Sequence, residues 1–235
     1  MIFLDTETFN EKPIKHGTYA YTSTCELMVV TYALNDEPIE VWDRTAQPKI
    51  PEYLGYLLLD TDELITAHAA MFDRNVLKYA LKMDIPIPRW RCSMVRALAH
   101  ALPGGLDSLC EILDVDQDLR KLKSGRQLMQ LFCMPRPVKS VLRRATRMTH
   151  SAEWAEFLKY ATNDISSMRA LDKKLPRWNY EGEELALWHL DQKINDRGFL
   201  VDTDLATAAV RAGECAKARL VDRSMALTNQ EVEST

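Results

Sequence analysis

The sequence has no long hydrophobic run and few residues that interrupt regular structure. Its longest apolar stretches, such as Leu27–Leu34 and Tyr53–Leu59, are far shorter than the ~18 residues of a membrane helix. With 8 Gly and 10 Pro in 235 residues, and no repeat, it does not fit the collagen-like or disordered classes. The N-terminus lacks the basic start and apolar core of a signal peptide. We therefore expect a globular, cytoplasmic protein with no membrane partner.

Cysteine is sparse and shows no framework pattern. The five cysteines are odd in number, scattered, and never spaced as CxxC: Cys25, Cys92, Cys110, Cys133 and Cys215. This distribution argues against a disulfide scaffold and against a zinc site. We expect reduced, mostly buried thiols.

Hydrophobic periodicity predicts a sheet followed by helices. At roughly 150 residues per domain, 235 residues correspond to one domain and an appendage. Strands are predicted at Met1–Thr6, Glu26–Leu34 and Ile39–Trp42 as an antiparallel meander, with a further buried strand at Leu64–Ala67. Helices are predicted at Pro51–Leu59, Asp73–Met83, Met94–Ala101, Leu106–Leu113, Gly125–Phe132, Ala152–Leu175, Glu181–Asp196 and Thr203–Met225. Ser151 and Asp202 are predicted N-caps of two of these helices.

Positive charge is concentrated in one segment, which we call the basic strip (residues 119–149). The whole chain has a net charge of −4, yet the strip contains no acidic residue. Its nine basic residues are Arg120, Lys121, Lys123, Arg126, Arg136, Lys139, Arg143, Arg144 and Arg147. Such a strip suits a polyanion backbone, because each neutralised phosphate releases counterions. A solvated helical face explains the charge equally well.

Acidic residues gather at the predicted end of the first strand. Asp5 and Glu7 lie two positions apart, so strand alternation puts both side chains on one face, roughly 6 to 7 Å apart. Like charges this close repel each other unless a cation lies between them. The pattern favours a metal site, although a solvated turn remains an alternative.

Two further motifs carry polar groups at helix positions. Asp73 follows the buried strand and falls in the first turn of a helix, where an acidic residue is also simply a good helix start. Tyr160 and Asp164 are four residues apart on one face of a long helix, beside its apolar stripe. This position indicates a semi-buried site, whereas an ordinary surface pair is the alternative.

Taken together, these motifs resemble the tyrosine subtype of the DEDD family of 3′–5′ exonucleases. The order is Asp5-x-Glu7, then Phe72-Asp73, then Tyr160-x-x-x-Asp164, with 68 and 91 residues between the successive aspartates. Within that family the chain looks most like the proofreading domain of phage and bacterial family A DNA polymerases. Two segments are similar to such enzymes, Ile14–Tyr21 and Pro103–Cys110.

The resemblance also suggests a division of the chain. It covers residues 1–178, which we expect to form the exonuclease domain. Residues 187–202 look like the stretch that leads into a polymerase domain, so residues 179–235 are expected to be a helical extension. These 57 residues are too few for a polymerase domain.

The resemblance implies an α/β, ribonuclease H-like fold with a mixed central sheet flanked by helices. It implies a metal-dependent 3′–5′ exodeoxyribonuclease that acts in proofreading during DNA replication. Two Mg²⁺ or Mn²⁺ ions would be held by four carboxylates, Asp5, Glu7, Asp73 and Asp164, and Tyr160 would orient the attacking water. These five residues form the expected catalytic set.

The expected substrate is single-stranded DNA or a frayed primer 3′ end, with a polymerase domain as a partner in cis or in trans. Thr6 and Phe72 lie beside the acidic motifs, and an aromatic ring there can stack on a base. From the basic strip, Arg143, Arg144 and Arg147 are expected to contact phosphates.

The sequence departs from the family pattern at one position. Ala69 stands four residues before Asp73, where members usually have Asn. Its methyl group cannot hydrogen-bond to a substrate strand, but no metal ligand is lost. A DNA-clamping module with weak nuclease activity and an RNA-trimming exonuclease of the same fold remain alternative functions.

Overall fold

The computed structural model describes residues 1–116, 125–137, 139–140 and 142–229. Its centre is a mixed five-stranded sheet with the order β3-β2-β1-β4-β5. The strands are β1 (Ile2–Phe9), β2 (Glu26–Leu34), β3 (Glu40–Asp43), β4 (Ile65–Ala67) and β5 (Trp90–Cys92). β1, β2 and β3 pair antiparallel, whereas β4 and β5 extend the sheet in parallel from β1. The predicted meander and the α/β class are confirmed.

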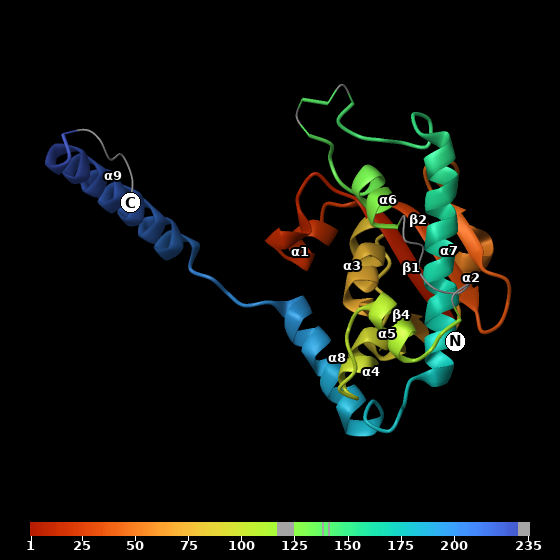
Figure 1. The fold of residues 1–235 in the computed structure, drawn as a ribbon. Coiled ribbons are helices and arrows are strands. Elements are labelled where there is room, and N and C mark those ends of the chain that lie inside the picture. Colours follow the sequence, from red (N-terminus) through yellow and green to blue (C-terminus); the bar gives the residue numbers. More distant parts are fainter. Residues whose placement is uncertain (117–124, 138, 141, 230–235) are drawn as a thin grey trace. The chain divides into compact units, whose positions relative to one another are not determined.

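Helices pack on both faces of this sheet (Figure 1). The described helices of the whole chain are α1 (Thr18–Thr22), α2 (Glu52–Leu59), α3 (Ala70–Ala80), α4 (Ser93–Leu98), α5 (Leu106–Ile112), α6 (Gly125–Phe132), α7 (Ser151–Lys174), α8 (Gly182–Arg197) and α9 (Thr203–Leu227). Two short 3-10 turns, η1 (Ile14–His16) and η2 (Ile87–Arg89), complete the described elements. In Figure 1, α3 and α7 flank the central strand β1.

The alternation of side chains along β1 separates two halves of the core. Ile2 and Leu4 pack in one cluster with Val76 and Leu77 of α3. Phe3 instead packs with residues of α5 and α7, including Ile165. Because successive strand residues face opposite sides, the odd-numbered positions that follow Phe3 are directed toward α7.

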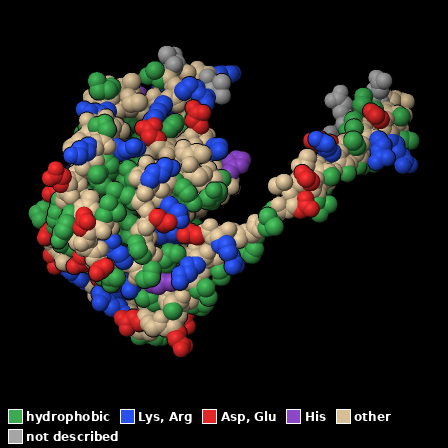
Figure 2. All heavy atoms as spheres, turned by 180° about the vertical axis from the view of Figure 1, so that it is seen from behind, with side chains coloured by type: hydrophobic (Ala, Val, Ile, Leu, Met, Phe, Trp, Pro, Cys, Tyr) green, Lys and Arg blue, Asp and Glu red, His purple; other side chains and the backbone are tan. Residues whose placement is uncertain are grey.

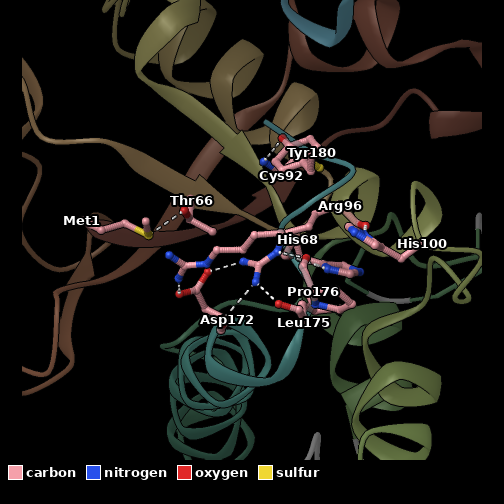
Figure 3. Close-up of polar contacts among 12 residues, drawn as sticks. Met1, Thr66, His68, Cys92, Arg96, His100, Asp172, Leu175, Pro176 and Tyr180 are labelled. Atoms are coloured by element: carbon pink, nitrogen blue, oxygen red, sulfur yellow. Dashed lines mark hydrogen bonds and ion pairs between the residues drawn. The ribbon is translucent and has the colours of Figure 1, made fainter. Parts of the chain in front are cut away.

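The C-terminal end of α7 is fixed by one buried arginine. The Arg96 guanidinium forms an ion pair with Asp172, with 2.6 Å between Nη1 and Oδ1 (Figure 3). It also donates to the backbone carbonyls of Leu175 and Pro176, just after the helix ends. A cation at this end satisfies free carbonyls and complements the helix dipole. Arg96 therefore anchors the helix that carries Tyr160 and Asp164.

Several boundaries differ from the sequence predictions. β1 continues to Phe9, so Asp5 and Glu7 lie within the strand and not at its end. Ser151 is the first residue of α7, and the cap position is taken by His150 without a side-chain hydrogen bond, so that cap prediction was wrong. Asp202 caps α9 as predicted, because its carboxylate accepts a 2.9 Å hydrogen bond from the Leu205 amide.

The chain divides into two compact units, Met1–Gln192 and Lys193–Thr235. Tyr180 and Trp188 are buried in the core of the first unit, so the segment just after residue 178 packs with that unit. The functional boundary expected at residue 178 stays a prediction, whereas the helical character of the extension agrees with α8 and α9.

Helix α9 in the second unit has no buried residue. Hydrophobic and charged side chains alternate along its surface (Figure 2). The exposed hydrophobic residues of α9 include Leu205, Val210, Leu220 and Leu227. Across the described ranges, no helix combines the length and the apolar character needed to cross a membrane.

Candidate metal centre

Three of the predicted acidic residues meet where α7 crosses β1. Asp5 and Glu7 come from the face of β1 that is directed toward α7, and Asp164 comes from α7 itself. One carboxylate oxygen from each lies within 4.8 Å of the other two. Among the described residues, this is the one group of acidic, His or Cys side chains close enough together to hold a metal ion. Glu7 is 4% exposed and Asp164 is 6% exposed, whereas Asp5 is half-buried.

This donor set fits a divalent cation. Three carboxylates in a largely buried position repel one another, and burial makes each negative charge costly unless it is compensated. Oxygen ligands of this kind are preferred by hard cations such as Mg²⁺ and Mn²⁺ over zinc. The acidic cluster (Asp5, Glu7 and Asp164) can therefore hold a divalent metal.

The fourth predicted carboxylate, Asp73, lies in the first turn of α3 and outside the acidic cluster. Its Oδ1 accepts hydrogen bonds from the Thr6 amide (3.0 Å) and from the Thr6 hydroxyl (2.7 Å). Thr6 is an even-numbered position of β1, so its side chain is directed away from Asp5 and Glu7. The structure thus brings three carboxylates together, and a ligand role for Asp73 stays a prediction.

Burial dominates the electrostatics of Asp73. Its side chain is 2% exposed, and desolvation raises the pKa of the carboxyl from 3.8 to about 7, although the two hydrogen bonds from Thr6 act in the opposite direction. A buried carboxylate without a nearby cation favours its protonated form. The Asp73 carboxyl therefore changes between its protonated and its charged form near pH 7.

Tyr160 lies one helical turn before Asp164 and is 2% exposed. Burial raises the pKa of its hydroxyl well above the usual value, and the negative charges of Asp164, Glu7 and Asp5 raise it further. The phenol therefore stays protonated at neutral pH and can donate a hydrogen bond. This agrees with the predicted orienting role and argues against proton abstraction.

The arginines of the basic strip differ in their surroundings. Arg144 donates two hydrogen bonds to the Glu26 carboxylate, at 2.6 and 3.0 Å, and its guanidinium lies 4.1 Å from the centre of the Phe9 ring. Arg147 lies 3.9 Å from the Asp43 carboxylate. Arg143 is exposed. Arg120, Lys121 and Lys123 lie outside the described residues.

The two residues expected beside the substrate end are both close to the acidic motifs. Thr6 is buried and bonded to Asp73, as described above. Phe72 is half-buried, and its ring lies 5.8 Å from that of Tyr21. Contact of these residues with nucleic acid stays a prediction.

Sequence reasoning missed one neighbour of the acidic cluster. Cys133 follows α6, is buried, and its thiol lies 3.7 Å from Oε2 of Glu7, to which it donates a hydrogen bond. Burial raises the pKa of this thiol well above its usual value, and the Glu7 charge adds to the effect. The two residues are 126 positions apart, so no local pattern could have identified the contact.

Comparisons with known proteins give a sequence relative and a solved structure of similar fold. No protein-family model matches the chain. A DNA polymerase of Bacillus phage SP02 is 31% identical over 231 residues, which are 96% of this chain and 35% of the polymerase. The chain thus spans about a third of the length of that relative.

The fold has a solved counterpart. The structure of Brucella melitensis NrnC bound to pGG superposes with a TM-score of 0.51 and 21% sequence identity, over 82% of this chain and 79% of NrnC. At this level of identity the likeness concerns the fold alone. The sequence match and the fold agree with the resemblance to a DEDD-type exonuclease domain of a DNA polymerase.

Proposed function

We propose that this chain is the 3′–5′ exonuclease part of a phage-type DNA polymerase and hydrolyses phosphodiester bonds at DNA 3′ ends. The observation that carries the proposal is the acidic cluster, Asp5, Glu7 and Asp164, with the protonated phenol of Tyr160 one turn away on α7. The match to a polymerase over nearly the whole chain supports DNA as the substrate and proofreading as the context.

The carboxylates have distinct positions and therefore distinct proposed roles. Asp5, Glu7 and Asp164 would hold one Mg²⁺ or Mn²⁺, Asp5 would bridge to a second ion, and Asp73 would support that second ion. When bound, such ions polarise a phosphoryl oxygen and lower the pKa of water. Without such ions, the negative charge of the carboxylates would repel a phosphate, so binding of the scissile phosphate should depend on the metal.

Tyr160 and the surrounding residues would then position the reactants. The Tyr160 hydroxyl would donate a hydrogen bond to the attacking water and hold it in line with the scissile bond. Phe72 is partly exposed and would stack on a terminal base. Within the part of the chain that the structure describes, Arg143 makes no acidic contact of the kind that holds Arg144, so we expect it to contribute most to phosphate binding within that pair.

A test of the proposal is cleavage of a labelled single strand in a series of metals. Wild type should shorten DNA in Mg²⁺ or Mn²⁺, bind without much cleavage in Ca²⁺, and be inactive in excess chelator, because Ca²⁺ has looser coordination. An RNA strand of the same sequence, assayed in parallel, measures the preference between the two nucleic acids.

Two isosteric variants complete this test. Asp164→Asn keeps the shape of the side chain but removes one charge of the cluster, and it should abolish cleavage. Asp62→Asn removes an exposed carboxylate elsewhere and should leave cleavage unchanged. Cleavage at full rate in chelator, or by the Asp164 variant, would contradict the proposal. Strong binding of DNA without any cleavage would favour the clamping alternative.

A further inference from the structure

Helix α6 lies directly against the ring of Tyr160. Gly125 is the first residue of this helix, and α6 packs against α7. A Cβ atom built on Gly125 would lie 2.2 Å from Cε2, 2.7 Å from Cδ2 and 3.0 Å from Cζ of Tyr160. Real Cβ atoms essentially never come closer than 3.0 Å to a neighbouring atom. Any side chain at this position would therefore force the tyrosine ring or the helix to move.

The need for glycine here comes from this contact and not from the backbone. Gly17, Gly182 and Gly198 have positive φ angles, which L-residues rarely adopt. Gly125 is not among the residues with positive φ, so an alanine could adopt its backbone conformation. The close approach to Tyr160 is thus the physical reason for a glycine at this position.

The Tyr160 ring has little room to avoid such a clash. It is 2% exposed and belongs to one core cluster with Leu128 and Phe132 of α6. On its own helix, the Phe157 ring is nearly parallel to it, with 6.4 Å between the centroids. A closely packed interior transmits a displacement to neighbouring groups instead of absorbing it.

The other end of α6 also touches the site. Cys133 directly follows the helix, and its thiol donates the 3.7 Å hydrogen bond to Glu7. The helix therefore contacts the tyrosine at its first residue and a carboxylate of the acidic cluster just past its last. Cys133 lies eight positions from Gly125, so a clash at Gly125 falls first on the Tyr160 ring.

We propose that Gly125 is a positioning residue, which lets α6 pack against the Tyr160 ring and so holds the phenol hydroxyl at the acidic cluster. The inference rests on the proposed function for the role of Tyr160, but the packing contact itself does not depend on that function. Gly125 touches no reacting atom and acts only through Tyr160.

Thermal unfolding tests the packing contact without reference to activity. Gly125→Ala should lower Tm by roughly 2 to 10 °C, because overpacking forces neighbouring groups to move. Gly55→Ala is the matched control, since Gly55 lies in α2 and a Cβ atom there would meet nothing within 4 Å. This control should raise Tm by roughly 2 to 4 °C, as alanine is favoured over glycine inside helices.

Tyr160→Ala provides the second half of the packing test. It removes the ring that the new methyl group would meet, so Gly125→Ala should lower Tm much less in that background than in wild type. If Gly125→Ala alone does not fold, recovery of a cooperative transition in the double variant supports the proposal equally. Equal losses of Tm in both backgrounds would overturn it.

Kinetics separate positioning from mere stability. In the wild-type background, Gly125→Ala should lower kcat on DNA by roughly 10 to 1,000-fold, as loss of the oriented phenol would, with KM nearly unchanged. In the Tyr160→Phe background, the ring and its clash remain but the hydroxyl is already absent. There, Gly125→Ala should still lower Tm while kcat falls little further.

The outcomes for the two proposals are distinct. A similar loss of kcat in the wild-type and Tyr160→Phe backgrounds would assign Gly125 a purely structural role and overturn the inference. Absence of nuclease activity in the wild-type protein would refute the proposed function, whereas the Tm measurements would still decide whether Gly125 and Tyr160 are coupled.

Discussion

Replacing Asp73 with asparagine should make the metal-free protein more stable at pH 8. Burial raises the pKa of this carboxyl from 3.8 to about 7, so the folded state binds its proton more tightly than the unfolded state does. The wild-type protein therefore loses stability as the pH rises from about 4 to about 7. Asparagine resembles the protonated acid and can still accept the two hydrogen bonds from Thr6 through its side-chain oxygen.

The size of the effect follows from that pKa. At 1.36 kcal/mol per unit, a rise from 3.8 to about 7 corresponds to an upper limit of roughly 4 kcal/mol at pH 8. At pH 5 the carboxyl is still protonated in the folded state, and the penalty falls to roughly 1 to 2 kcal/mol. Relaxation around the charge and water penetration reduce both figures, so we expect a gain of roughly 2 to 4 kcal/mol at pH 8.

Thermal or urea unfolding in excess chelator measures this difference. For a chain of this size the gain corresponds to roughly 5 to 15 °C in Tm at pH 8, and to much less at pH 5. Asp62→Asn serves as the control, because Asp62 is exposed and its replacement should have a small effect at both pH values. An Asp73 variant that is less stable than wild type at pH 8 would refute the reasoning.

Further predictions concern the site and its surroundings. Asp164→Ala should lower turnover by several powers of ten, whereas Tyr160→Phe should lower it by roughly 10 to 1,000-fold. Steady-state kinetics measure both losses, and equal losses would contradict the separate roles of the two residues. Ala69→Gly should stabilise the protein by roughly 1 kcal/mol in urea unfolding, because Ala69 has a φ of 63°. Arg143→Ala should weaken binding of single-stranded DNA and reduce its salt slope by roughly 0.7, whereas Arg144→Ala should mainly lower Tm, since its ion pair and ring contact are lost.

Strand alternation placed Asp5 and Glu7 on one face, and helix spacing placed Asp164 beside Tyr160, but only the family resemblance joined these motifs into one site. The structure brings the three carboxylates together, and their role as metal ligands stays a prediction. The end of β1 was misplaced because Thr6, Glu7 and Thr8 are polar, and polarity indicates a strand end unless the groups are buried. In the structure these side chains are buried, as pairing with β2 continues to Phe9 past a register shift between Glu7 and Thr8.

Contacts between distant segments were beyond the reach of sequence patterns. The position of Asp73 follows from its hydrogen bonds with Thr6, which lies 67 residues away. β5 was missed because Trp90–Cys92 is only three residues long and has a charged residue, Arg91, at its centre, whereas the equally short β4 has no charged residue. The partner of Arg144 is Glu26, 118 residues away, so charge counting could not distinguish this neutralised arginine from the exposed Arg143.

The central claim is that the acidic cluster removes nucleotides from the 3′ end of DNA. The most direct measurement follows a single strand labelled at its 5′ end in Mg²⁺, with the released products separated by chromatography. The account predicts a ladder that shortens one nucleotide at a time, release of deoxynucleoside monophosphates, and no products with Asp164→Asn. Release of the 5′ label as the first product, or an unchanged ladder with Asp164→Asn, would contradict it.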